Sequence, residues 1–265
     1  MASGYRVKEF GGPEVMIWEP LNLGELAPDA VRVRVGASGI NFAETRMRAG
    51  DYSGQELPFV MGMEVAGSVE QVGREVAGFK VGDRVFGRVR GAHAEVVDCD
   101  PAHLMPLPEN LSYTQGAAIP VGWLTAWHAL YTVGRMAPGD RVLVEAVGGS
   151  VGSAALALAK QAGCWTLGTA SRNDKLARAT ALGCDAVVNY TCESVSEQVA
   201  SLTNGEGMDI GLMTIGDATA HALIDSMGMD GRVVMFGSTG GRDITFNLRI
   251  GILNIQLLSM SISTS

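Results

Sequence analysis

Short stretches in which apolar and polar residues alternate dominate the first part of the chain. Residues 31–35 have the sequence Val-Arg-Val-Arg-Val, the alternation expected of a half-buried strand. Residues 65–72 and 84–86 are two further short strand candidates. Turn-forming pairs such as Gly82-Asp83 lie between the candidates. Several short strands separated by such turns predict a β-rich, barrel-like domain.

The pattern changes after Pro108. Ser112 and Gln115 have the spacing of a capping box, which predicts that a short helix begins there. Pro120 interrupts this helix, and a second helix is expected over residues 124–133. We therefore place a domain boundary near residue 120, with one domain over residues 1–120 and a second over residues 121–265.

From residue 141 onward, apolar runs of strand length alternate with segments of helical periodicity. The predicted strands cover residues 141–145, 165–170, 186–189, 209–213 and 232–236, and the predicted helices cover residues 151–162, 174–182, 195–202 and 218–227. Residues 255–262 are a late, apolar strand candidate. Strands that alternate with helices of this length predict βαβ units and a parallel sheet, so the second domain belongs to the α/β class.

Composition and charge exclude several classes of partner. The 265 residues are 47% hydrophobic, which is typical of a globular protein, and the formal net charge of -8 argues against a nucleic-acid partner. We see no apolar signal core and no stretch suited to spanning a bilayer, so we expect a cytoplasmic protein that binds no membrane. The four cysteines form no CxxC pair and are expected to be free thiols.

A glycine-rich turn lies between the first predicted strand of the second domain and its helix. Residues 143–152 have the sequence Leu-Val-Glu-Ala-Val-Gly-Gly-Ser-Val-Gly. The start of a helix offers free N–H groups and the positive end of the helix dipole, both of which suit a pyrophosphate. Gly149 and Gly152, with Ser150 and Val151 between them, would let the backbone approach the phosphates. This context favours a dinucleotide site over a purely structural turn.

The end of the second strand of this domain distinguishes NAD from NADP. NAD enzymes usually place Asp or Glu there to hold the ribose hydroxyls, whereas this chain has Ala170. Ser171, Arg172 and Lys175 follow, and a hydroxyl with two cations suits a 2′-phosphate. The alternative is that both cations are merely solvated in the first turn of a helix. The missing acid favours NADPH as the cofactor.

Six short motifs, in order and in register, resemble one family over essentially the whole chain. They are Gly-Ile-Asn-Phe-Ala-Glu at 39–44, Ala-Gly-Asp-Tyr at 49–52, Pro-Phe-Val-Met-Gly-Met-Glu-Val-Ala-Gly at 58–67, Val-Gly-Asp-Arg-Val at 81–85, Thr-Ala-Trp at 125–127 and Asp-Ala-Val-Val-Asn-Tyr at 185–190. The chain resembles the zinc-free quinone oxidoreductase and enoyl reductase branch of the medium-chain dehydrogenase/reductase superfamily.

This resemblance implies a GroES-like catalytic domain joined to a Rossmann domain, with the active site in the cleft. It makes residues 39–44 and 48–52 the first active-site strand and loop. It also implies that Ser171, Lys175 and Tyr190 contact the adenosine 2′-phosphate.

Several positions depart from the related metal enzymes. Asn41 and Met63 stand where zinc alcohol dehydrogenases have their catalytic cysteine and ligand histidine, and neither side chain suits zinc, so we expect no metal. Ser150 replaces a usual glycine, and His93 replaces a usual aromatic residue. Family members continue beyond the position of Ser265 with a helix and strands that complete the catalytic domain, so the sequence is expected to be either a fragment or a naturally short form that lacks this segment.

The resemblance implies hydride transfer from NADPH to a quinone or to an activated double bond of an enone or enoyl substrate. Tyr52 is the candidate proton donor, with a packing role as the alternative. Asn41 is the candidate partner of the nicotinamide ribose or of the reacting oxygen, and Thr125 that of the carboxamide.

A second function remains open, namely an NADPH-binding scaffold or regulatory protein with little turnover. For either function we expect a small-molecule ligand and a homodimer. The dimer is expected to pair through the sheet edge formed by residues 255–262.

Overall fold

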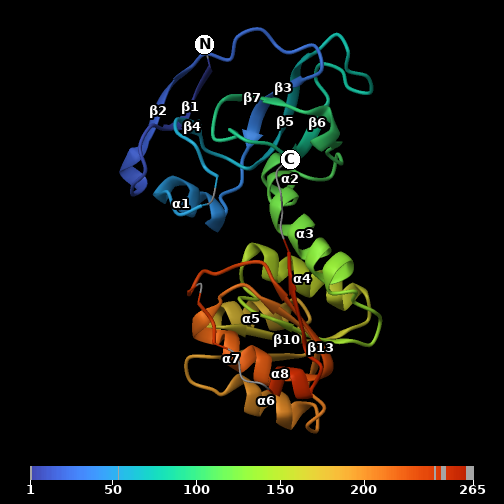
Figure 1. Ribbon diagram of the computed structural model, residues 1–265. Coiled ribbons are helices and arrows are strands. Elements are labelled where there is room, and N and C mark those ends of the chain that lie inside the picture. Colours follow the sequence, from blue (N-terminus) through green and yellow to red (C-terminus); the bar gives the residue numbers. More distant parts are fainter. Residues whose placement is uncertain (1, 53, 242, 246–248, 261–265) are drawn as a thin grey trace. The chain divides into compact units, whose positions relative to one another are not determined.

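The computed structural model describes residues 2–52, 54–241, 243–245 and 249–260. The chain divides into two compact units, Met1–Val121 and Gly122–Ser265. Figure 1 shows the first unit in blue to green and the second in green to red. Within the described part, no helix is long and apolar enough to cross a membrane.

The first unit contains two antiparallel sheets. The smaller has the order β2-β1-β4, from Ala2–Val7 (β1), Met16–Leu21 (β2) and Phe59–Val60 (β4). The larger has the order β7-β3-β5-β6-β8, from Val31–Ala37 (β3), Glu64–Val72 (β5), Arg84–Arg88 (β6), Val96–Cys99 (β7) and Leu104–Pro106 (β8). Val31 and Val33 of β3 are buried in the core, whereas Arg32 pairs with Asp98 and Arg34 with Glu70. The predicted alternation therefore gives one apolar and one polar face, and the expected β-rich domain is confirmed.

Helix α1 (Phe42–Ala49) corrects the expectation that residues 39–44 and 48–52 form a strand and loop. β3 ends at Ala37, and Asn41 has the extended backbone of a helix N-cap. The Asn41 N–H donates to Glu44 Oε2 over 2.6 Å, which is half of a capping box. Gly50 ends the helix with φ of 79°, a left-handed conformation that glycine adopts without strain.

Two short helices follow the larger sheet. The predicted capping box opens α2 (Tyr113–Ala117), because the Gln115 N–H donates to Ser112 Oγ and the Ser112 N–H to Gln115 Oε1. The next helix differs from the expectation of residues 124–133. It starts at Pro120 as α3 (Pro120–Trp127) and widens into a π-helical stretch, His128–Val133. Proline is accepted in a first helical turn because its missing N–H needs no partner there.

The second unit is a six-stranded sheet with the order β11-β10-β9-β12-β13-β14, in which every pair is parallel. Its strands are Arg141–Val144 (β9), Trp165–Ala170 (β10), Ala186–Asn189 (β11), Met208–Met213 (β12), Met227–Met235 (β13) and Gln256–Ser259 (β14). Its helices are Ser150–Gln161 (α4), Asn173–Ala181 (α5), Val195–Leu202 (α6), Asp217–Asp225 (α7) and Arg249–Ile252 (α8). This strand order is that of a Rossmann domain, so the predicted fold class is confirmed. Residues 261 and 262 of the predicted last strand lie outside the described residues.

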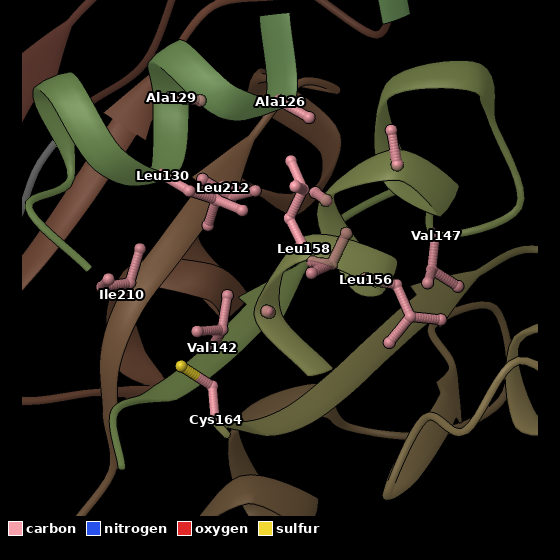
Figure 2. Close-up of a cluster of buried hydrophobic side chains, with 14 of the residues drawn as sticks. Ala126, Ala129, Leu130, Val142, Val147, Leu156, Leu158, Cys164, Ile210 and Leu212 are labelled. Atoms are coloured by element: carbon pink, nitrogen blue, oxygen red, sulfur yellow. The ribbon is translucent and has the colours of Figure 1, made fainter. Parts of the chain in front are cut away.

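Apolar side chains cover both faces of this sheet. Val142 and Leu212 pack with Leu156 of α4 in one cluster, as Figure 2 shows. Leu143 lies in a second cluster with Leu223 of α7. Full burial of one such leucine contributes roughly 1.5–3 kcal/mol. Because successive residues of a strand point to opposite faces, Glu145 follows Leu143 toward the face that α7 covers.

The junction between β9 and β12 joins the two halves of the sheet. At its amino end, the Arg141 N–H donates to Asp209 Oδ2 over 2.7 Å, and the Arg141 guanidinium pairs with Asp209 and Glu206. The crossovers from β9 and from β12 lead to opposite faces, so this carboxyl edge is a topological switch point. Ligands of open α/β sheets bind outside such an edge.

Candidate functional site

The glycine-rich turn after β9 is tightly folded. Ala146 has φ of 49°, and its carbonyl accepts from the Gly149 N–H over 2.8 Å. A Cβ atom at Gly152 would lie 2.3 Å from the same carbonyl oxygen, so only glycine fits that position. Gly149 is the N-cap of α4, and Ser150, Val151 and Gly152 form its first turn. The N–H groups of a first turn have no intrahelical acceptor, which makes this turn suited to hold a pyrophosphate.

Ser150 occupies the turn without disturbing it. A Cβ atom placed at Gly122 would lie 2.3 Å from Ser150 Oγ, so the hydroxyl fits into space that a glycine leaves beside it. Gly148 is close to a different side chain. A Cβ there would lie 2.7 Å from Lys175 Cβ, so the Lys175 stem passes over the backbone of the turn. Lys175, a predicted 2′-phosphate residue, is thus packed against the glycine-rich turn.

The start of α5 carries the residues predicted to select NADPH. Ala170 is buried at the end of β10, and Ser171, Arg172 and Lys175 are all exposed. The Arg172 guanidinium makes a two-bond ion pair with Asp174, with Nε to Oδ1 and Nη2 to Oδ2 both 2.9 Å. This pairing lowers the pKa of Asp174. It also occupies part of the Arg172 charge, which the sequence pattern did not indicate.

Tyr190 lies beside this segment, because β11 is the neighbour of β10. Its N–H donates to the Ala170 carbonyl over 3.3 Å, and its side chain is half-buried. The side chain of the preceding residue, Asn189, connects β11 to α5. Asn189 Nδ2 donates to Asn173 Oδ1 over 2.7 Å, which joins the end of β11 to the first residue of α5. Tyr190 and the Ser171 segment are therefore brought together.

The first unit contains a buried polar cluster around Asn41. Asn41 Nδ2 donates to Glu64 Oε1 over 2.7 Å, and the Val121 N–H donates to Glu64 Oε2 over 2.8 Å. Glu44 Oε1 lies 3.5 Å from His93 Nε2, which is 3.0 Å from the Gly39 carbonyl oxygen. The exposed fractions are 1% for Glu44 and 3% for Glu64. The amide of Asn41 is thus held between two buried carboxyl groups.

Burial raises the pKa values of both Glu44 and Glu64, because a charged carboxylate loses hydration in this environment. Hydrogen bonds oppose the shift, from Asn41 to Glu44 and from Val121 and Asn41 to Glu64. Asn41 was predicted as a site residue from the sequence, whereas roles for Glu44 and Glu64 and the contact of His93 were not predicted. The Asn-x-x-Glu spacing from Asn41 to Glu44 was the available signal.

Tyr52 and Thr125 occupy different surroundings. Tyr52 follows the end of α1 and is 40% exposed, and the N–H of the preceding Asp51 donates to the Arg46 carbonyl over 2.9 Å. The eight residues of α1 lie between Asn41 and Tyr52 and span about 12 Å along the helix axis. Thr125 is buried in α3 and belongs to the second unit.

Neither Asn41 nor Met63, which stand at zinc-ligand positions of the related metal enzymes, is a good zinc ligand. The Asn41 amide nitrogen already donates to Glu64, and Met63 offers a thioether, a poor zinc ligand. Among the residues that the structure describes, no three or more His, Cys, Asp or Glu side chains are grouped to hold a metal ion.

Two families match separate parts of the chain. The Alcohol dehydrogenase GroES-like domain matches residues 27–109, and Zinc-binding dehydrogenase matches residues 150–264. A quinone oxidoreductase of Pseudomonas aeruginosa is 34% identical over 252 residues, covering 94% of this chain and 78% of the relative. A 2-haloacrylate reductase of a Burkholderia species is 32% identical over 238 residues, covering 87% and 72%.

Solved structures of quinone oxidoreductases are also similar to this chain. A quinone oxidoreductase of Pseudomonas syringae pv. tomato has a TM-score of 0.92 at 35% identity, covering 98% of this chain and 82% of that one. The Escherichia coli quinone oxidoreductase complexed with NADPH has a TM-score of 0.90 at 29% identity, covering 98% and 81%.

Fold and turn together define a protein with a GroES-like domain and a Rossmann dinucleotide-binding domain. The chain belongs to the medium-chain dehydrogenase/reductase superfamily, in its quinone oxidoreductase-like branch.

Proposed function

We propose that this protein is a zinc-independent, NADPH-dependent reductase that acts on a quinone or on an activated carbon–carbon double bond. The carrying observation is the contact between the Lys175 stem and Gly148, next to an Ala170 that leaves no acid at the strand end. The NADPH complex of the Escherichia coli relative and the 2-haloacrylate reductase relative support the cofactor and the acceptor class.

The second unit binds and orients the cofactor in this proposal. The first turn of α4, with Gly149 as its N-cap, holds the pyrophosphate through its free N–H groups. Ser171 and Lys175 hold the 2′-phosphate, with Tyr190 beside them, and Thr125 holds the carboxamide. When bound, NADPH supplies the hydride, which is chemistry that protein side chains do not provide.

The first unit supplies the polar groups for the substrate side. Asn41 Nδ2 donates to Glu64 over 2.7 Å and lies 3.4 Å from Glu44 Oε2, so both amide protons have acceptors. Its oxygen faces the Glu44 N–H in the capping box and has a second lone pair that can accept a further hydrogen bond, which favours a ribose hydroxyl over a negatively charged reacting oxygen. Tyr52 is left as the candidate proton donor, because its hydroxyl can donate a hydrogen bond or a proton to the reacting substrate.

An acceptor panel tests this function. Absorbance of NADPH is followed with a quinone, an enone and an enoyl thioester, and each assay is repeated with NADH and after treatment with a metal chelator. We expect oxidation of NADPH by at least one acceptor, a much lower rate with NADH, and no loss after chelation. Loss of activity on chelation, equal rates with the two cofactors, or NADPH binding without any turnover would each contradict the proposal.

We also propose a homodimer that pairs through β14. This strand bonds to β13 on one side, and Leu257 and Leu258 on it are only half-buried. An open strand of this kind favours pairing across a two-fold axis, which closes the edge.

Light scattering at micromolar concentration should give twice the 27.8 kDa chain mass. Leu258→Lys should shift the protein to monomer, because a lysine on an edge strand opposes pairing. Leu182→Lys is the matched control, since Leu182 is exposed at the end of α5, which packs on the opposite strands β10 and β11. A monomeric wild type, or a Leu258→Lys dimer, would count against this interface.

A further inference from the structure

A buried carboxyl group connects the turn after β9 to the loop after β12 and to the start of α7 at the carboxyl edge of the second sheet. Glu145 directly follows β9 and is 3% exposed. Its Oε2 accepts from the N–H groups of Thr214 and Ile215, over 2.9 and 3.0 Å. Its Oε1 accepts from Thr219 Oγ1 over 2.6 Å. One side chain thus holds the loop after β12 and the first turn of α7.

The same loop is bonded to the segment after β13. The Thr239 N–H donates to the Thr214 carbonyl over 3.3 Å, and the Gly240 N–H donates to the Ile215 carbonyl over 2.6 Å. Gly216 has φ of 86°, and a Cβ there would lie 2.4 Å from the Gly241 carbonyl oxygen. The two loops are therefore closely packed, and neither can shift without breaking these contacts.

The place of Glu145 in the sheet relates this network to the cofactor. Ala146, its neighbour, begins the phosphate turn, and the residues assigned to the adenosine half follow β10 and β11 on one side of that turn. A dinucleotide crosses the carboxyl edge at the switch point, so its other half extends toward β12 and β13. The Glu145 network lies on that side.

We propose that Glu145 is a positioning residue that holds the loop after β12 in the conformation that receives the nicotinamide half of the cofactor. This inference rests on the proposed NADPH function. Without a carboxyl or amide oxygen at this place, the Thr214 and Ile215 N–H groups lose their acceptor, and the loop must move to find another. Burial raises the pKa of Glu145, and the three hydrogen bonds oppose that shift.

A split-ligand titration tests the proposal. Calorimetry compares NADPH with 2′,5′-ADP, which carries only the adenosine half. Glu145→Leu removes both oxygens at similar volume, and we expect NADPH affinity to fall about 10- to 100-fold, as for one or two lost hydrogen bonds. Affinity for 2′,5′-ADP should stay within about twofold. Glu145→Gln should restore NADPH binding to within about threefold, because its amide oxygen can accept from both N–H groups.

Thr203→Val is the matched control. Thr203 is also buried, accepts from the Gly207 N–H over 2.9 Å and lies before β12, at the opposite edge of the sheet. It should lower the melting temperature without changing the ratio of the two affinities. Thr219→Val removes one Glu145 bond and serves if Glu145→Leu does not fold, with an expected loss of about three- to tenfold for NADPH alone.

The positioning role would be overturned if Glu145→Leu, or Thr219→Val in its place, weakened the binding of NADPH and 2′,5′-ADP equally. It would also be overturned if the variant weakened the binding of neither. A wild type that binds neither NADPH nor 2′,5′-ADP would instead contradict the proposed function itself. The two failures are therefore distinguishable in the same titrations.

Discussion

Tyr52→Phe is expected to lower turnover of an enone or enoyl thioester by about 100- to 10,000-fold, the usual contribution of a positioned general acid. Reduction of such a double bond needs a proton at carbon or a partner for the developing oxyanion, and the Tyr52 hydroxyl is the proposed source. Tyr52 lies two residues after Gly50, the C-cap of α1, and its side chain is partly exposed. Steady-state rates with saturating NADPH measure the effect.

Two controls separate this role from packing. Quinone reduction should suffer less, because water can protonate the hydroquinone oxygens. Tyr113→Phe removes a hydroxyl elsewhere in the same unit, where the Tyr113 ring packs under the Arg84 guanidinium, and should leave enone turnover within about twofold. NADPH affinity should be unchanged in both variants. Enone turnover of Tyr52→Phe within about twofold of wild type would make Tyr52 a packing residue.

Lys175→Ala is expected to weaken NADPH binding by about 10- to 100-fold while NADH binding barely changes. A charge-assisted hydrogen bond contributes about 1.5–3 kcal/mol, and Lys175 is the cation whose stem contacts the phosphate turn. Calorimetry with both cofactors measures the difference. Equal affinities for NADPH and NADH in the wild type would contradict the proposed preference for NADPH.

Substitutions of Arg172 and Arg178 test whether the effect of Lys175→Ala on NADPH binding is specific to Lys175. Arg172→Ala should have a smaller effect than Lys175→Ala, because Asp174 already shares its charge through two 2.9 Å hydrogen bonds. Arg178 is exposed in the last turn of α5, so Arg178→Ala removes one positive charge from the same helix without touching the phosphate turn. If Arg178→Ala weakens NADPH binding as much as Lys175→Ala does, the loss reflects the net positive charge of α5 and not a specific contact of Lys175 with the 2′-phosphate.

The second unit was more predictable from the sequence than the first. The strands at 165–170 and 186–189 and the helix at 195–202 have the predicted bounds, because each is a locally periodic segment between turns. In the first unit, β1, β2 and β4 were not predicted. β4 has only two residues and exists through its pairing with Arg6 and Val7, which lie far away in sequence. Local pattern carries no information about such a partner.

The side-chain contacts at the candidate site could be predicted only in part. The strand–turn–helix context of the glycine-rich turn was visible, because its glycines and flanking periodicity are local. The hydrogen bond from Asn41 to Glu64 joins residues 23 positions apart, and that from Thr219 to Glu145 joins residues 74 apart. The Arg172–Asp174 pair is local but depends on a rotamer, which residue type does not determine.

The strand order of the second sheet also limits the order in which the strands can pair while the chain is being synthesised. β9, β10 and β11 emerge first and form one half of the sheet, so the other edge of β9 has no partner until β12 is made. In the finished sheet, Arg141 and Glu145 fasten the two ends of that junction to partners some 70 residues later in the chain. Because closing so long a loop must precede any gain from these contacts, we expect docking of the second half to be a slow step in the folding of this domain.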